Sequence, residues 1–149
     1  MMGVHDRLEA GFHAHQVALL DRDFARAGTA LAAYRELLAT HVDDEEEHVL
    51  PRYAAAGGDG TDAPVRLFLG EHRNLLAFAA EFGERLAALV ASPDDHALLV
   101  LFDREATFKN LVMHHDLRER RMLYPFLAER LSADEQLAVL ARVRSPAGG

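Results

Sequence analysis

Residues 115–125 read HDLRERRMLYP, and residues 41–51 read HVDDEEEHVLP. In both stretches a glutamate follows four positions after the histidine, and a proline follows six positions after the glutamate. Side chains four residues apart lie one above the other on a helix, so each stretch directs an imidazole and a carboxylate toward one point. Iron, manganese and zinc bind these two ligand types together. The two copies therefore predict a duplicated metal site.

Apolar residues recur at steps of three and four through most of the chain, and strand-like alternation is absent. This spacing is typical of amphipathic helices. It predicts helical hairpins over about residues 4–53 and 64–129, and a short last helix over about 133–143. We expect one all-α domain over residues 1–149: an antiparallel, up-down-up-down four-helix bundle with a short C-terminal fifth helix.

Turn and capping signals divide the chain at the expected helix ends. Asp23 suits the N-cap of the second helix, and residues 54–62 form a glycine-rich linker between the hairpins. Residues 92–95 supply a serine, a proline and two acids, which mark the start of the fourth helix. Residues 132–135 read SADE, a capping box for the short last helix.

The composition narrows the classes of function. The chain has 149 residues, a formal net charge of −8 and no cysteine. The negative charge disfavours nucleic acid as a partner, and the missing cysteines exclude disulfides, thiolate ligands and iron–sulfur clusters. No apolar run reaches the roughly 20 residues that cross a bilayer, and no secretory signal is visible. We expect a cytoplasmic protein without a membrane partner.

Antiparallel hairpins bring two further histidines level with the two copies, because residues equally far from a turn lie at the same height. The midpoint of His5 and His41 is residue 23, in the first expected turn. The midpoint of His72 and His115 lies between residues 93 and 94, in the second. Glutamates in an apolar bundle would cost several kcal/mol each unless they were paired or bound a cation. The expected metal ligands are His5, His41, Glu45, His72, His115 and Glu119.

His13 is the alternative to His5 as the first ligand. Its midpoint with His41 is residue 27, beside Gly28, which is a second candidate for the turn. The apolar stripe of the second helix starts at Phe24, however, and this start favours His5.

Other polar residues near the apolar stripes are expected to have ordinary structural roles. His15 should be a satisfied core histidine, two to three turns from the site. Glu105 interrupts the stripe of the fourth helix and should pair with an arginine on a neighbouring helix. The acids around Glu45 should form a mostly solvated face: Asp43, Asp44, Glu46 and Glu47.

The pattern resembles the hemerythrin-like, or HHE cation-binding, family over residues from about 4 to 129. The matching pieces are His5-Asp6-Arg7-Leu8, His41-x3-Glu45-x5-Pro51, Glu71-His72 and His115-x3-Glu119-x5-Pro125. The resemblance implies two iron ions with an oxo or hydroxo bridge, and manganese or zinc would suit the same ligands. It implies that His5 and His41 bind one ion and that His72 and His115 bind the other. Glu45 and Glu119 would bridge the two ions.

Two differences from animal hemerythrins resemble the bacterial branch of the family. Animal hemerythrins have a fifth histidine one turn after the third, where this chain has Leu76. Their last bridging residue is an aspartate five positions after its histidine, whereas Glu119 follows His115 by four.

The ligand set leaves about one open position per metal ion if each ion is octahedral. An open position on ferrous iron suits a small gas or peroxide, and the resemblance implies the same ligands. We therefore expect binding or sensing of oxygen, peroxide or nitric oxide. The alternatives are an enzyme that disproportionates peroxide or oxidises ferrous iron, an iron storage or repair protein, and a metal-stabilised interaction module.

Overall fold

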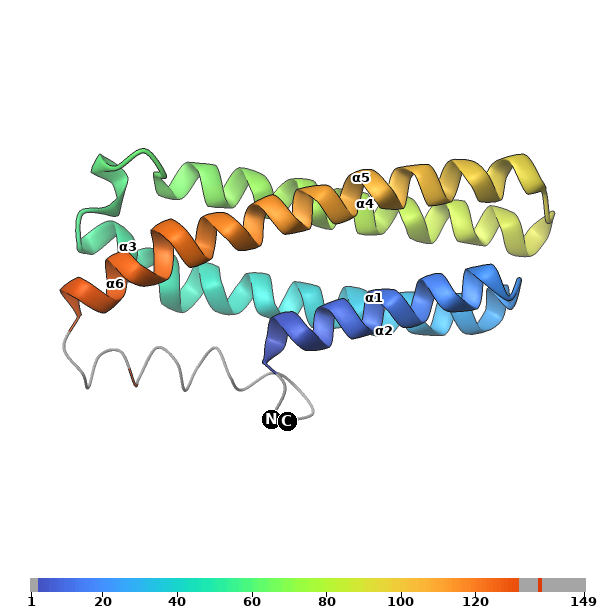
Figure 1. The fold of residues 1–149 in the computed structure, drawn as a ribbon, viewed down its shortest axis with the longest axis horizontal. Helices are drawn as coiled ribbons and strands as arrows, with labels where there is room; N and C mark the ends of the chain where they lie inside the picture. The colour runs from blue at the N-terminus through green and yellow to red at the C-terminus, as the bar shows by residue number, and fades with distance from the viewer. Residues whose placement is uncertain (1–2, 132–136, 138–149) are drawn as a thin grey trace. The chain divides into compact units, whose positions relative to one another are not determined.

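The computed structural model describes residues 3–131 and residue 137, and all regular structure in them is helical (Figure 1). The α-helices are α1 (Val4–Leu20), α2 (Phe24–Asp44), α3 (Leu50–Ala55), α4 (Val65–Ala91), α5 (Asp95–Arg118) and α6 (Tyr124–Arg130). Two π-helical turns, η1 (Glu45–Val49) and η3 (Glu119–Leu123), and a 3-10 turn, η2 (Gly58–Gly60), complete the order. The predicted last helix over 133–143 lies outside the described residues, apart from residue 137.

The predicted starts of the second and fourth helices carry side-chain caps. Asp23 Oδ1 accepts a hydrogen bond from the backbone N–H of Arg26 at 3.0 Å. Asp94 Oδ2 accepts one from the backbone N–H of Ala97 at 2.8 Å. Each aspartate satisfies one of the N–H groups that a helix leaves without an internal partner at its start. The helices predicted from apolar spacing therefore begin where the capping residues indicated.

Both His-x3-Glu stretches end in a π-helical turn, which the sequence pattern did not predict. The backbone N–H of Leu50 bonds the carbonyl of Glu45, and that of Tyr124 bonds the carbonyl of Glu119. Each bond spans five residues and immediately precedes a proline. Proline has no N–H, and its ring clashes with the carbonyl four residues earlier, so an α-helical turn cannot pass through it unchanged.

The chain divides into two compact units. Unit 1 comprises Met1–Ala39 and Leu76–Lys109, and unit 2 comprises Thr40–Leu75 and Asn110–Gly149. The single domain and the up-and-down order of the helices stay predictions. No helix in the described part of the chain combines the length and the apolarity needed to cross a membrane.

Unit 1 is built around four aromatic rings, one from each of α1, α2, α4 and α5. The rings belong to Phe12, Tyr34, Phe82 and Phe108, and each side chain is at most 6 % exposed. Phe12 lies 5.1 Å from Tyr34 and 5.2 Å from Phe108 between ring centroids. Burying each such ring contributes about 1.5–3 kcal/mol. The predicted apolar stripes therefore meet in this unit.

A buried polar pair lies in the same unit and differs from the sequence-based expectation. His15 Nδ1 donates to the carbonyl of Ala27 at 2.9 Å, and His15 Nε2 lies 2.6 Å from Glu105 Oε2. Gln16 Nε2 donates to the other oxygen of Glu105 at 3.1 Å. His15 is thus the satisfied core histidine that was expected. The predicted arginine partner of Glu105 is wrong, because this carboxylate is fully buried and His15 already occupies its Oε2.

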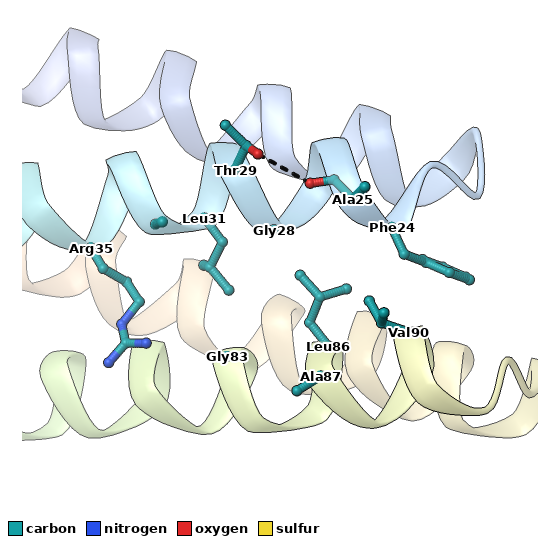
Figure 2. Close-up of a pocket in the computed structure, with 11 residues that line it drawn as sticks. Phe24, Ala25, Gly28, Thr29, Leu31, Arg35, Gly83, Leu86, Ala87 and Val90 are labelled. Atoms are coloured by element: carbon teal, nitrogen blue, oxygen red, sulfur yellow. Dashed lines mark hydrogen bonds between the residues drawn. The ribbon is translucent and has the colours of Figure 1, made fainter.

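Small residues leave a groove along the surface of unit 1 (Figure 2). Its volume is about 490 Å³. It is lined by Phe24, Ala25, Gly28, Thr29, Leu31, Ala32, Arg35, Gly83, Leu86, Ala87 and Val90. These residues include no histidine and no carboxylate, so the groove offers no ligands of the predicted kind.

Unit 2 has its own apolar core, and the linker packs into it. The core comprises Val49, Leu50, Tyr53, Ala63, Phe68, Leu123 and Leu127. The Tyr53 hydroxyl donates to the carbonyl of Ala63 at 2.7 Å. A Cβ at Gly58 would lie 2.4 Å from the Tyr53 ring, so only glycine allows this close approach. The linker is therefore held against this core, whose Phe68 ring also packs edge-on to His115.

Candidate metal centre

Five of the six predicted ligands lie in unit 2 and are buried. They come from α2, η1, α4, α5 and η3, and none is more than 4 % exposed: His41, Glu45, His72, His115 and Glu119. Each His-x3-Glu pair spans the junction of an α-helix with a π-helical turn. The four-residue spacing therefore keeps the imidazole and the carboxylate on one face, as expected.

The ligand atoms of these side chains converge. Glu45, His72, His115 and Glu119 each offer one atom within 4.8 Å of the others. His41 Nε2 lies 2.7 Å from Glu45 Oε1. His72 Nε2 lies 3.7 Å from the same oxygen. This buried histidine and glutamate cluster is able to hold a metal ion.

Hydrogen bonds on the outer nitrogens prepare two of the imidazoles for ligation. His72 Nδ1 donates to Glu46 Oε2 at 2.7 Å, and His115 Nδ1 donates to Glu71 Oε1 at 2.9 Å. A carboxylate only accepts, so the proton sits on Nδ1 in both rings. Nε2 then carries a lone pair and faces the cluster. Histidine ligands of metals are commonly held in this way.

The buried oxygen and nitrogen atoms of the cluster leave hydrogen-bonding capacity unused, and a cation could bind them. Within the described chain, no hydrogen-bond partner is present for either oxygen of Glu45 or for Nε2 of His72. His41 and His72 offer Glu45 charge partners, but a fully buried carboxylate whose oxygens lack well-formed hydrogen bonds still costs free energy. A metal ion would bind both these oxygens and the imidazole nitrogens, so the donor set fits the predicted cofactor.

The electrostatics of the cluster keep Glu45 ionised. Burial raises the pKa of Glu45, but the imidazoles of His41 and His72 outweigh burial and hold the pKa at about 2. Burial lowers the pKa of His72, whereas Glu45 and Glu46 raise it, and the net shift is upward. The pKa of His115 is lowered, because burial there outweighs Glu71. The Glu45 carboxylate is therefore anionic at neutral pH, which suits a candidate metal ligand.

Two glutamates next to the cluster were not predicted to act there. Glu46 was expected on a mostly solvated face, and its side chain is 36 % exposed, but its carboxylate also binds His72. Glu71 binds both His115 and Arg118. A glutamate directly beside a ligand in sequence was the one available signal, since Glu46 follows Glu45 and Glu71 precedes His72.

Tyr124 also borders the cluster. Burial raises the pKa of its hydroxyl, and the nearby carboxylates of Glu45 and Asp116 raise it further. The hydroxyl therefore stays protonated and remains a hydrogen-bond donor at neutral pH. The duplicated pattern gave no signal for a hydrogen-bond donor at position 124, because the other copy has Leu50 at the corresponding position.

The first ligand remains a prediction. His5 lies in the first turn of α1, in unit 1, and its side chain is half-buried. The alternative, His13, lies on the same helix and is exposed. The exposure of His13 does not suit a ligand in an apolar interior, which agrees with the preference for His5.

Comparison with known proteins identifies the family. The family model of the hemerythrin HHE cation-binding domain matches residues 1–127. No curated protein matches the chain, and no solved structure matches it. The match covers the whole described cluster, including both His-x3-Glu pairs. The chain belongs to the hemerythrin HHE cation-binding domain family.

Proposed function

We propose that this protein is a non-haem di-iron protein that binds or senses a small ligand: oxygen, peroxide or nitric oxide. One observation carries the proposal. Two imidazoles and two carboxylates, all buried, bring ligand atoms within 4.8 Å of one another in a member of a cation-binding family. Mixed nitrogen and oxygen ligands without sulfur suit iron, and manganese or zinc would bind the same set.

The proposed ligand assignment follows the duplicated pattern. His5 and His41 would hold one iron, and His72 and His115 would hold the other. Glu45 and Glu119 would bridge them, as glutamates do in dinuclear helical bundles generally. The sequence symmetry supports the inclusion of His5. The assignment assumes a single up-down-up-down bundle. It also places the chain in the bacterial branch of the family, because Leu76 stands where animal hemerythrins have a fifth histidine.

The side chains around the cluster favour a small ligand over a large one. The Phe68 ring packs edge-on to His115 with 6.4 Å between centroids, and Phe68 has no exposed surface. Leu75 is 4 % exposed, one turn of α4 beyond His72. These groups restrict water near the ligands. When bound, ferrous iron supplies an open coordination position for oxygen, peroxide or nitric oxide.

One spectroscopic experiment tests the proposal. The iron-loaded protein is reduced without oxygen and then exposed to air, and its ultraviolet–visible spectrum is followed. A charge-transfer band that appears with air and disappears on removal of oxygen supports binding or sensing. His115→Ala should abolish the band, whereas His114→Ala, at an exposed neighbouring position, should retain it.

Two other outcomes would replace the proposal. Rapid, repeated consumption of added peroxide would establish the peroxide-disproportionating enzyme instead. A spectrally silent protein that contains zinc would leave only a structural role for the metal.

A further inference from the structure

We propose that Glu46 and Glu71 are positioning residues of the metal centre, and that they give its histidines unequal donor strength. This inference rests on the proposed function, because it concerns the same site. It adds two residues outside the ligand set and an asymmetry that the duplicated sequence pattern does not contain.

Each glutamate holds a ligand that belongs to a different helix. Glu46 lies in η1 and accepts from His72 of α4 at 2.7 Å. Glu71 lies in α4 and accepts from His115 of α5 at 2.9 Å. Neighbouring residues on a helix are turned by about 100°, so Glu46 cannot share the direction of Glu45. Its carboxylate instead reaches the outer nitrogen of His72, and Glu71 does the same for His115.

These contacts fix both the proton position and the ring orientation. An imidazole that donates from Nδ1 to a carboxylate presents the lone pair of Nε2, and the carboxylate increases the basicity of that nitrogen. Nε2 of His72 and of His115 are the atoms that face the cluster. The two glutamates therefore orient the rings through their outer nitrogens.

The charges of the two glutamates are balanced differently. Arg118 Nε donates to Glu71 Oε2 at 3.0 Å, so a guanidinium shares the charge of that carboxylate. In the described chain, no arginine or lysine forms an ion pair with Glu46, whose side chain is 36 % exposed. The negative charge of Glu46 therefore acts on His72 without a cationic partner. We infer that His72 is the stronger donor of the two.

The test compares charge-neutral variants of the iron-loaded protein. Glu46→Gln and Glu71→Gln keep an acceptor oxygen but remove the charge. Glu47→Gln is the matched control. It makes the same charge change one residue after Glu46, at a side chain that is 70 % exposed. The measurements are ferrous-ion affinity, by competition with a chelator, and the midpoint potential of the bound iron.

Both variants should weaken ferrous binding by about 10- to 100-fold. They should also raise the midpoint potential, because a lost negative charge disfavours ferric iron. The rise should be larger for Glu46→Gln. Glu47→Gln should change neither quantity appreciably. Arg118→Gln keeps all ligands and both carboxylates, and should lower the potential because it frees the charge of Glu71.

The outcomes separate this inference from the proposed function. If the wild-type protein binds no iron, the proposed function and the inference both fail. If the wild type binds iron but Glu46→Gln and Glu71→Gln behave like Glu47→Gln, only the positioning role is overturned. Equal shifts for the two glutamates, or an unchanged potential in Arg118→Gln, would overturn the asymmetry.

Discussion

Glu105 lies in the apolar interior of unit 1 with no exposed surface, and its carboxylate is satisfied by His15 and Gln16. Removing one partner of a buried pair leaves the other without compensation, which typically costs about 3–5 kcal/mol. We therefore expect Glu105→Ala to lower the free energy of unfolding by that amount in a urea titration. Glu84→Ala, at an exposed position of α4, is the control and should change it by less than about 0.5 kcal/mol.

At the same scale, the choice between His5 and His13 is open to a direct test. Both histidines lie on α1, but His5 is half-buried and His13 is exposed. We expect His5→Ala to lower the metal content of the purified protein and His13→Ala to leave it unchanged. Glu45→Ala should lose more metal than His5→Ala, because a bridging carboxylate serves both ions. The reverse order between His5 and His13 would move the first ligand to His13.

At the scale of the helices, α4 and α5 are tied by a charge cluster in unit 1. Arg104 donates two hydrogen bonds to Glu81, and Arg85 donates a third. The hydrogen bonds from Arg104, aided by Arg85, hold the pKa of Glu81 at about 2, below the ordinary value of 4.5. A lowered folded-state pKa means that the ionised carboxylate stabilises the fold above the unfolded-state value and loses this contribution as the pH falls.

The lowered pKa of Glu81 predicts how stability changes with pH. Glu81→Gln should be less stable than the wild type at pH 7, with a difference that persists down to about pH 4.5. Between about pH 4.5 and pH 2 the difference should shrink, because the wild-type carboxylate becomes protonated. Urea unfolding of both proteins across this range measures it. A difference that stays constant to pH 2 would show that the ion pairs do not set the stability.

The helices themselves were largely predictable from sequence. Apolar spacing, Asp23 and the start signal of residues 92–95 marked the helices, and the four-residue spacing of His41 and Glu45 placed both on one face. Contacts between helices were harder to predict, because they depend on how each helix is rotated about its own axis. Apolar spacing defines this rotation only to within about a residue, which is roughly 100°. The contact of Glu46 with His72 was missed, and the partner of Glu105 was mistaken, for this reason.

The π-helical turns were missed for a different reason. The proline six residues after each glutamate was visible in sequence, but a proline in a helix also permits a kink or an end. A π-helical turn results only where the helix continues beyond the proline, as it does here in α3 and α6. π-helical turns are frequent at functional sites, and both turns here begin at a proposed bridging glutamate.

At the scale of the whole molecule, metal binding should be linked to folding. Without a cation, the buried carboxylate of Glu45 has only the imidazoles of His41 and His72 beside it, and hydrogen-bond geometry is met at neither of its oxygens among the described residues. A ligand that binds only the folded protein stabilises it, and protonation of the histidines opposes metal binding. We expect a chelator to lower the melting temperature, and metal to be lost as the pH falls toward the histidine range. An unchanged melting curve after complete metal removal would contradict the linkage.

The central claim is that the buried histidine and glutamate cluster holds two metal ions, and elemental analysis of protein purified from iron-replete cells tests it most directly. We predict about two ions per chain, mainly iron, as in dinuclear helical bundles. His115→Ala should lose most of this metal, and His114→Ala should retain it. A metal-to-protein ratio below one in the wild type, or no loss of metal in His115→Ala, would contradict the claim.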